Sequence, residues 1–223
     1  MVNYESEYKK QLVKNLKEVL FLLDTDDMKF KIQSWADKFG YSFDEILEKI
    51  KKDPIFSCVF AKDPAKQNLY QKLAANYIER LSVVKDFATL PQGGKKALYL
   101  VNGKLLDGNV LDKASKDTKS IDFAWKVGDY LFFASHKYTK DSGGAQDNQY
   151  ADIQEFLRHA RDNNYKKHIF LAICDGKYYL QKDAQTGSET KIERLKKLTC
   201  QNSFVITIEE LERFLTSEEY KKV

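Results

Sequence analysis

Two neighbouring apolar segments carry the charged residues with the clearest capacity for chemistry. The segments cover residues 119–125 and 130–137, with a Gly-Asp pair between them. Each is a near-continuous apolar run, which is typical of a buried strand. The first nevertheless contains Asp122, and the second ends in Lys137. Because burial of an unpaired charge costs several kcal/mol, we expect the carboxylate and the amine to have a functional role.

The turn between the segments predicts which side chains share a face. A two-residue loop that begins with glycine fits a type II′ hairpin turn and pairs Val127 with Tyr130. The same register places Asp122 opposite Ser135, and directly opposed residues lie on one face of a sheet. Lys137 lies two residues further along and points to that face as well. The residues expected on the opposite face are Ile121, Phe123 and Trp125.

The elements around this hairpin alternate between helix and strand. Residues 3 to about 87 have helical spacing, with a capping box at Ser42 and Glu45 and a last helix over 65–87. Strands are predicted at 97–101, in the two hairpin segments, at 168–174 and at 203–208. Helices are predicted over 150–161 and 208–220. The chain therefore reads as an α/β protein with a helical N-terminal region.

An Asp at the start of one strand, followed by Ser-x-Lys on its hairpin partner, resembles the PD-(D/E)XK nuclease superfamily, most nearly its type II restriction endonucleases. The resemblance covers roughly the C-terminal two-thirds of the chain. It implies a restriction-endonuclease-like core of helix, three strands, helix and strand, with a mixed central sheet flanked by helices. We expect residues 65–223 to form this nuclease domain and residues 1–64 to form a helical region for dimerisation or DNA grip.

The sequence departs from the family motif at two positions. Ile121 stands where the motif has Pro, and Ser135 stands where it has Asp or Glu. Some restriction enzymes with Ser-x-Lys take the missing acid from the helix that follows, which here implies Asp152 or Glu155. Superfamily members also often bring an acid from the helix before the strands, and Glu79 is the corresponding candidate.

The resemblance implies hydrolysis of a phosphodiester with Mg²⁺. Carboxylate-bound Mg²⁺ can activate water, stabilise the phosphate and neutralise the leaving oxygen. Asp122 and either Asp152 or Glu155 would be metal ligands, and the carbonyl of His136 would add an oxygen. Lys137 would orient the attacking water and offset charge on the phosphate.

The loop after the hairpin has the composition of a DNA contact. Paired glycines let a backbone approach its partner closely, and the N-terminus of the following helix can receive a phosphate. Amide and lysine side chains can bind phosphates and base edges. The alternative is a solvated connection with Asp147 as helix N-cap. The candidate DNA-binding residues are Lys140, Ser142, Gly143, Gly144, Gln146, Asn148 and Gln149.

Composition limits the other classes of function. The 223 residues contain 37 Lys and Arg against 33 Asp and Glu, a net charge of +4, so DNA affinity needs a local basic patch. Three scattered cysteines fit a reducing cytoplasm better than a disulfide framework. The charged start and the lack of a long apolar run predict neither a secretory signal nor a membrane span. Glycine motifs for nucleotide cofactors are absent, and the dispersed histidines disfavour a zinc site.

These features lead to one main hypothesis and two alternatives. The main hypothesis is a cytoplasmic, Mg²⁺-dependent type II restriction endonuclease that cuts double-stranded DNA at a short sequence. A homodimer is expected because cutting both strands of a palindrome calls for two related sites. The alternatives are a non-catalytic DNA-binding protein on a nuclease scaffold, and a repair or recombination nuclease that recognises DNA structure.

Overall fold

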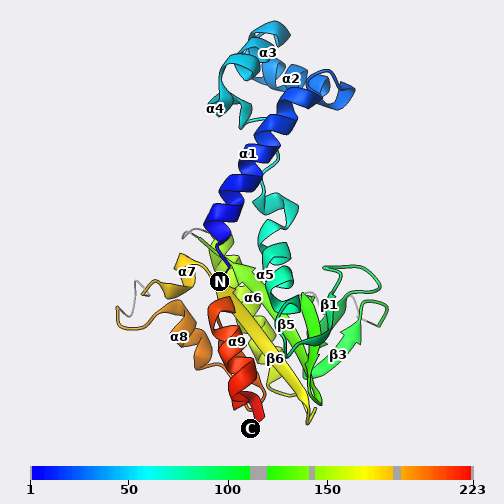
Figure 1. Ribbon diagram of the computed structural model, residues 1–223, viewed down its shortest axis with the longest axis vertical. Helices are drawn as coiled ribbons and strands as arrows, with labels where there is room; N and C mark the ends of the chain where they lie inside the picture. The colour runs from blue at the N-terminus through cyan, green and yellow to red at the C-terminus, as the bar shows by residue number, and fades with distance from the viewer. Residues whose placement is uncertain (1, 111–119, 141–143, 183–186, 222–223) are drawn as a thin grey trace. The chain divides into compact units, whose positions relative to one another are not determined.

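The computed structural model describes residues 2–110, 120–140, 144–182 and 187–221 (Figure 1). It divides into two compact units, Asn3–Lys72 and Leu73–Val223. The boundary predicted from sequence lay after residue 64. That position lies before the short 3-10 helix η1 (Ala65–Gln67) and the helix α5 (Leu69–Glu79). In the structure, η1 and the first residues of α5 belong to the N-terminal unit.

The N-terminal unit is helical, and side chains cap its main helices. The helices are α1 (Tyr4–Leu22), α2 (Asp26–Phe39), α3 (Phe43–Lys52) and the single turn α4 (Pro54–Ser57). The predicted capping box is confirmed, because Ser42 accepts from the Glu45 N–H and the Glu45 carboxylate accepts from Ser42 N–H. Such a box satisfies two backbone donors that the first helical turn leaves open. The unit has its own apolar core, which includes Val19, Met28, Ile32, Ala36, Ile46 and Ile50.

The C-terminal unit contains a mixed five-stranded sheet in the order β1-β4-β5-β6-β7. These strands are β1 (Lys85–Thr89), β4 (Phe123–Val127), β5 (Tyr130–Tyr138), β6 (His168–Asp175) and β7 (Ser203–Ile206). β1, β4 and β5 pair antiparallel, whereas β5, β6 and β7 pair parallel. A separate hairpin of β2 (Leu98–Val101) and β3 (Lys104–Asp107) follows β1 in the chain.

Helices cover both faces of this sheet, as Figure 1 shows for α6 (Gly144–Ala160) and α9 (Ile208–Ser217). Ile153 and Leu157 of α6 pack with Phe133 and Phe170 on one face. The short helices α7 (Lys177–Leu180) and α8 (Lys191–Lys196) join this cluster through Tyr178, Tyr179, Ile192 and Leu195. On the other face, α9 and the closing turn η2 (Glu219–Lys221) bring Phe214 and Tyr220 against the sheet. Within the ranges described, every helix is too short or too polar to cross a lipid bilayer.

The β4–β5 hairpin has the predicted register. Val127 pairs with Tyr130 and Phe123 with Ala134, and Gly128 has φ +56°. Positive φ at the first loop residue is what a type II′ turn requires. Regular pairing ends at Phe123, where the N–H of Asp122 donates to the carbonyl of Ala134 at 2.9 Å. Asp122 therefore lies at the point where the strand leaves the ladder.

Two local predictions were wrong. Ile121 was expected beside Phe123 on the far face, but it packs in the cluster with α6 because its N–H bonds the Leu98 carbonyl of β2 instead of β5. The helix predicted over 65–87 ends at Glu79, and residues 85–89 form the edge strand β1. Pairing with β4 stabilises that strand, and a bulge near Asp86 (φ +51°) interrupts its pattern.

Candidate active site

The structure brings four predicted residues together at the end of β5. Ser135 and Lys137 alternate with His136 on that strand and face α6. The Asp122 carboxylate interacts with both Ser135 and Lys137. Asp152 reaches the same place from α6, with its Oδ2 3.7 Å from the Nζ of Lys137. Lys137 thus lies under the influence of two carboxylates.

Asp122 is a buried carboxylate with incomplete charge compensation. Its exposed fraction is 6%, and its Oδ2 accepts a 2.8 Å hydrogen bond from the backbone N–H of His136. Burial raises the pKa of this carboxyl, and the charge of Lys137 is the largest opposing influence, followed by the His136 N–H. A group that burial disfavours in its charged form gains from any further cation placed beside it.

The Lys137–Asp152 pair is more accessible than Asp122. The two side chains are 23% and 24% exposed. A partly exposed ion pair of this length adds little to stability, about 0–1 kcal/mol. The pair therefore keeps a cation and an anion within reach of a ligand without being an important support of the fold.

His136 contributes its backbone to the site and its ring to the opposite face. The ring Nε2 lies 3.1 Å from Asp175 Oδ2, and both side chains are buried. The other oxygen of Asp175 accepts from the N–H of Ile208, the first residue of α9. These contacts of Asp175 fix the end of β5 on the face of the sheet opposite the candidate site. Sequence analysis missed this role, because the only signal at Asp175 was its position at the end of a strand.

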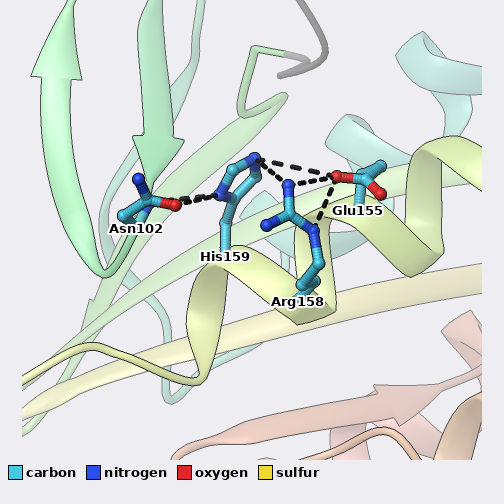
Figure 2. Close-up of polar contacts among 4 residues, drawn as sticks. All are labelled: Asn102, Glu155, Arg158 and His159. Carbon is cyan, nitrogen blue, oxygen red and sulfur yellow. Dashed lines mark hydrogen bonds and ion pairs between the residues drawn. The ribbon is translucent and has the colours of Figure 1, made fainter. Parts of the chain in front are cut away.

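Glu155, the alternative acid, belongs to a different network (Figure 2). Its Oε2 accepts from Nε and a terminal nitrogen of Arg158 at 2.9 and 2.6 Å, and lies 3.9 Å from His159 Nε2. The Nδ1 of His159 accepts from the N–H of Asn102 at 3.1 Å. This chain of contacts joins α6 to the β2–β3 turn. The structure therefore places Asp152, and not Glu155, beside Lys137.

Glu79 lies exposed at the last position of α5. Among the residues that the structure describes, it makes no hydrogen bond or ion pair with Asp122, Ser135, Lys137 or Asp152. The family-based expectation of an acid from this helix is therefore not met by a contact at the site.

The predicted DNA-binding residues have different environments. Lys140 and Asn148 are exposed, and Gly144 is the first residue of α6. Gln149 instead accepts a 2.7 Å hydrogen bond from the Thr139 hydroxyl. Asp147 is not an N-cap, because α6 begins three residues earlier; it accepts from the hydroxyl of Tyr178. Ser142, Gly143 and the side chain of Gln146 lie outside the described residues.

Thr139 directly follows β5 and Gly176 directly follows β6, and the backbones of these two segments are in close contact. The Thr139 N–H donates to Asp175 and its carbonyl accepts from Tyr178 N–H, while Gly176 has φ +101°. A Cβ at Gly176 would lie 2.1 Å from the Thr139 carbonyl oxygen. No side chain fits between the two segments.

Gly176→Ala is therefore expected to lower the free energy of unfolding by roughly 3 kcal/mol or more, through backbone strain and overpacking. The control is Gly128→Ala, because Gly128 also has positive φ but has open space around it. That variant should lose only about 1 kcal/mol. Urea unfolding of both variants measures the difference, and equal midpoints would show that the Thr139 contact does not restrict residue 176.

Magnesium was the predicted cofactor, and the donors suit it in part. No group of three or more His, Cys, Asp or Glu side chains around one point was found in the described part of the chain. Mg²⁺ is usually held by one or two carboxylates together with water and substrate phosphate. Asp122 and Asp152 fit this kind of coordination. Two carboxylates alone do not surround the ion with protein ligands.

Comparison with known proteins gives no family. No protein-family model matches the chain, and no curated protein matches it. Several solved chains match; among them, protein VC1899 from Vibrio cholerae aligns with 11% identity and a TM-score of 0.35, over 93% of this chain and 50% of that one. This chain therefore spans about half the length of that protein, and a likeness at this level supports no argument about function.

Proposed function

We propose that this protein is a Mg²⁺-dependent endonuclease that hydrolyses phosphodiester bonds of double-stranded DNA. The observation that carries the proposal is the meeting of Asp122, Lys137 and Asp152 at the end of the β4–β5 hairpin. The chain order α5, then β1, β4 and β5 of the main sheet, then α6 and β6, supports a restriction-endonuclease-like core.

Each residue has a distinct part in this proposal. Asp122 and Asp152 would hold the metal ion, with a carbonyl oxygen from His136. Bound Mg²⁺ supplies positive charge for the phosphate and for the leaving oxygen. Lys137 orients the attacking water and donates to a phosphate oxygen. Ser135 stands in place of the usual acid, and it favours the charged form of the Asp122 carboxyl by lowering its pKa.

The finer proposal is a type II restriction endonuclease that works as a homodimer. Two copies related by a twofold axis would present two such sites to the two strands of a palindrome. Lys140 and Asn148 are exposed near the N-terminal end of α6, where they can contact phosphates or base edges. Their place after β5 puts sequence readout close to the proposed point of cleavage.

A second candidate is a DNA-binding protein that keeps this scaffold without cleaving. Two features favour it: Ser135 stands in place of an acid, and the described residues contain no group of three metal-binding side chains. In that case Lys137 would only contact a DNA phosphate, with Asp152 as its ion-pair partner.

A plasmid assay separates the two candidates. We expect purified protein to nick or linearise supercoiled plasmid when Mg²⁺ is added, and EDTA to stop the reaction. Lys137→Ala should lower the rate of plasmid cleavage by about a hundredfold or more, because the lysine would act on the reacting phosphate. Lys126→Ala is the matched control, since Lys126 is on the same hairpin but is exposed and paired with Asp86. DNA binding without any Mg²⁺-dependent product would favour the second candidate.

A further inference from the structure

A cavity of about 460 Å³ lies at the start of β5, at the other end of the strand from Lys137. Its walls are the loop after α6 (161–166), the loop before β7 (200–202), Tyr130 and Tyr220. Ligand pockets in proteins typically measure about 300–1,000 Å³. Tyr130 and Lys137 are seven residues apart on one strand, which corresponds to about 23 Å at roughly 3.3 Å per residue. The cavity is therefore separate from the candidate active site.

Hydrogen bonds between two asparagines hold the walls of the cavity together. The Nδ2 of Asn163 donates to Asn202 Oδ1 at 2.7 Å, and the Nδ2 of Asn202 donates back to Asn163 Oδ1 at 2.6 Å. Asn202 also bonds the carbonyls of Tyr165 and His168. Two loops far apart in sequence thus form one rigid rim, so a ligand would meet a preformed site.

Aromatic rings in this cavity are held in place. Tyr165 stacks on His168 with centroids 4.2 Å apart, and its hydroxyl accepts from the Leu105 N–H at 3.4 Å. Tyr130 and Tyr220 form an edge-to-face pair, with ring centroids 5.1 Å apart. A ring that is already fixed loses little entropy when it receives a flat ligand, and nucleobases stack on such rings whatever their sequence.

Two cations at the rim have no acidic partner in the described part of the chain. Arg161 and Lys166 are exposed, and neither forms an ion pair within the described ranges. The neighbouring Lys167, by contrast, is paired with Asp129 at 2.9 Å and does not line the cavity. A guanidinium and an ammonium group together form a strong receptor for phosphate oxygens. The side-chain amides of Asn164 and Gln201 add donors and acceptors suited to base edges.

We propose that this cavity binds a nucleotide unit, with its base against Tyr130 and Tyr165 and its phosphate at Arg161 and Lys166. The unit is either a free mononucleotide or the terminal nucleotide of a single strand, which share this chemistry. The proposal does not depend on cleavage at Asp122 and Lys137, because it concerns binding at the opposite end of β5.

The test is calorimetric titration of the full chain without Mg²⁺, using dAMP, deoxyadenosine, inorganic phosphate and a 5′-phosphorylated single-stranded oligonucleotide. We expect dAMP to bind at least about tenfold more tightly than deoxyadenosine or phosphate. Arg161→Ala and Lys166→Ala should each weaken dAMP binding by about tenfold. Lys167→Ala, the matched control, should leave the affinity unchanged, and so should Lys137→Ala even if it abolishes cleavage.

Several results would overturn the proposal. These are no binding of dAMP, binding of phosphate as tight as that of dAMP, or equal losses in Lys166→Ala and Lys167→Ala. Loss of dAMP binding in Lys137→Ala would move the nucleotide to the active site and also overturn it. Tighter binding of the oligonucleotide, with the same dependence on Arg161 and Lys166, would support the proposal and identify a strand end as the ligand. Equal affinity would support a free mononucleotide.

Discussion

Asp122→Asn is expected to abolish DNA cleavage, by roughly a hundredfold to a thousandfold or more, while the protein stays folded and is at least as stable as wild type near neutral pH. The loss of cleavage follows because an amide cannot supply the charged oxygen that a divalent cation needs. The stability result follows from burial. A carboxyl whose pKa is raised by folding destabilises the folded state when it is ionised.

The sign of this effect can be checked against pH. Because the pKa of Asp122 is higher in the folded protein, its favourable contribution exists at low pH and is lost as pH rises through the folded-state value. Asn removes that dependence and can still accept the hydrogen bond from His136 N–H. As pH rises from acidic to neutral, the free energy of unfolding of wild type should therefore fall relative to that of Asp122→Asn.

Asp129→Asn is the matched control, because Asp129 lies in the turn of the same hairpin and is 79% exposed. It should keep full cleavage. Plasmid digestion reports the catalytic effect, and urea unfolding at several pH values reports the stability effect. Full cleavage by Asp122→Asn would exclude this carboxylate as a metal ligand and remove the basis of the proposed function.

The hairpin was predictable because local rules determine it. The turn residues select one loop length, and the loop length fixes which residues oppose each other. The clustering of Asp122, Ser135 and Lys137 follows from that register and from the alternation of side chains on β5. The alternation of side chains between the two faces holds only as far as the regular strand pairing, which ends at Phe123. For this reason the face predicted for Ile121 was wrong.

Features that depend on distant partners were not predictable. Asp152 and Glu155 are three residues apart on one helix, and sequence cannot say which of them meets Lys137. The choice depends on how α6 is rotated against the sheet and on Arg158 and His159, which bind Glu155. The strand at residues 85–89 likewise depends on β4 as its partner, since propensity alone allows the preceding helix to continue.

The site combines one buried acid with one accessible acid, and this division has a chemical consequence. Asp122 has no ready exchange with water, so its charge is compensated only by what lies next to it. Asp152 is 24% exposed and lies 3.7 Å from the Nζ of Lys137. Of the two carboxylates that would hold a metal ion, Asp122 is therefore the buried one and Asp152 the accessible one. We expect DNA to strengthen metal binding, because phosphate oxygens would complete the coordination.

Asp152→Asn and Glu155→Gln form a matched pair that tests the replacement of the missing acid. Both change an acid on α6 to its amide. We expect Asp152→Asn to reduce cleavage by about a hundredfold or more, because Asp152 is the acid beside Lys137. Its loss of stability should be small, at most about 1 kcal/mol, since the pair is partly exposed. Glu155→Gln should cleave at a rate close to wild type, because its carboxylate is occupied by Arg158.

Rates of plasmid cleavage over a Mg²⁺ titration distinguish the possible roles of Asp152. A metal ligand gives a higher Mg²⁺ requirement in Asp152→Asn, so part of the lost rate returns as Mg²⁺ is raised. A residue that only orients Lys137 lowers the rate by the same factor at every Mg²⁺ concentration. Loss of cleavage in Glu155→Gln with activity kept in Asp152→Asn would assign the missing acid to Glu155, and would require α6 to turn when DNA binds because Glu155 faces Arg158 and His159 in this structure.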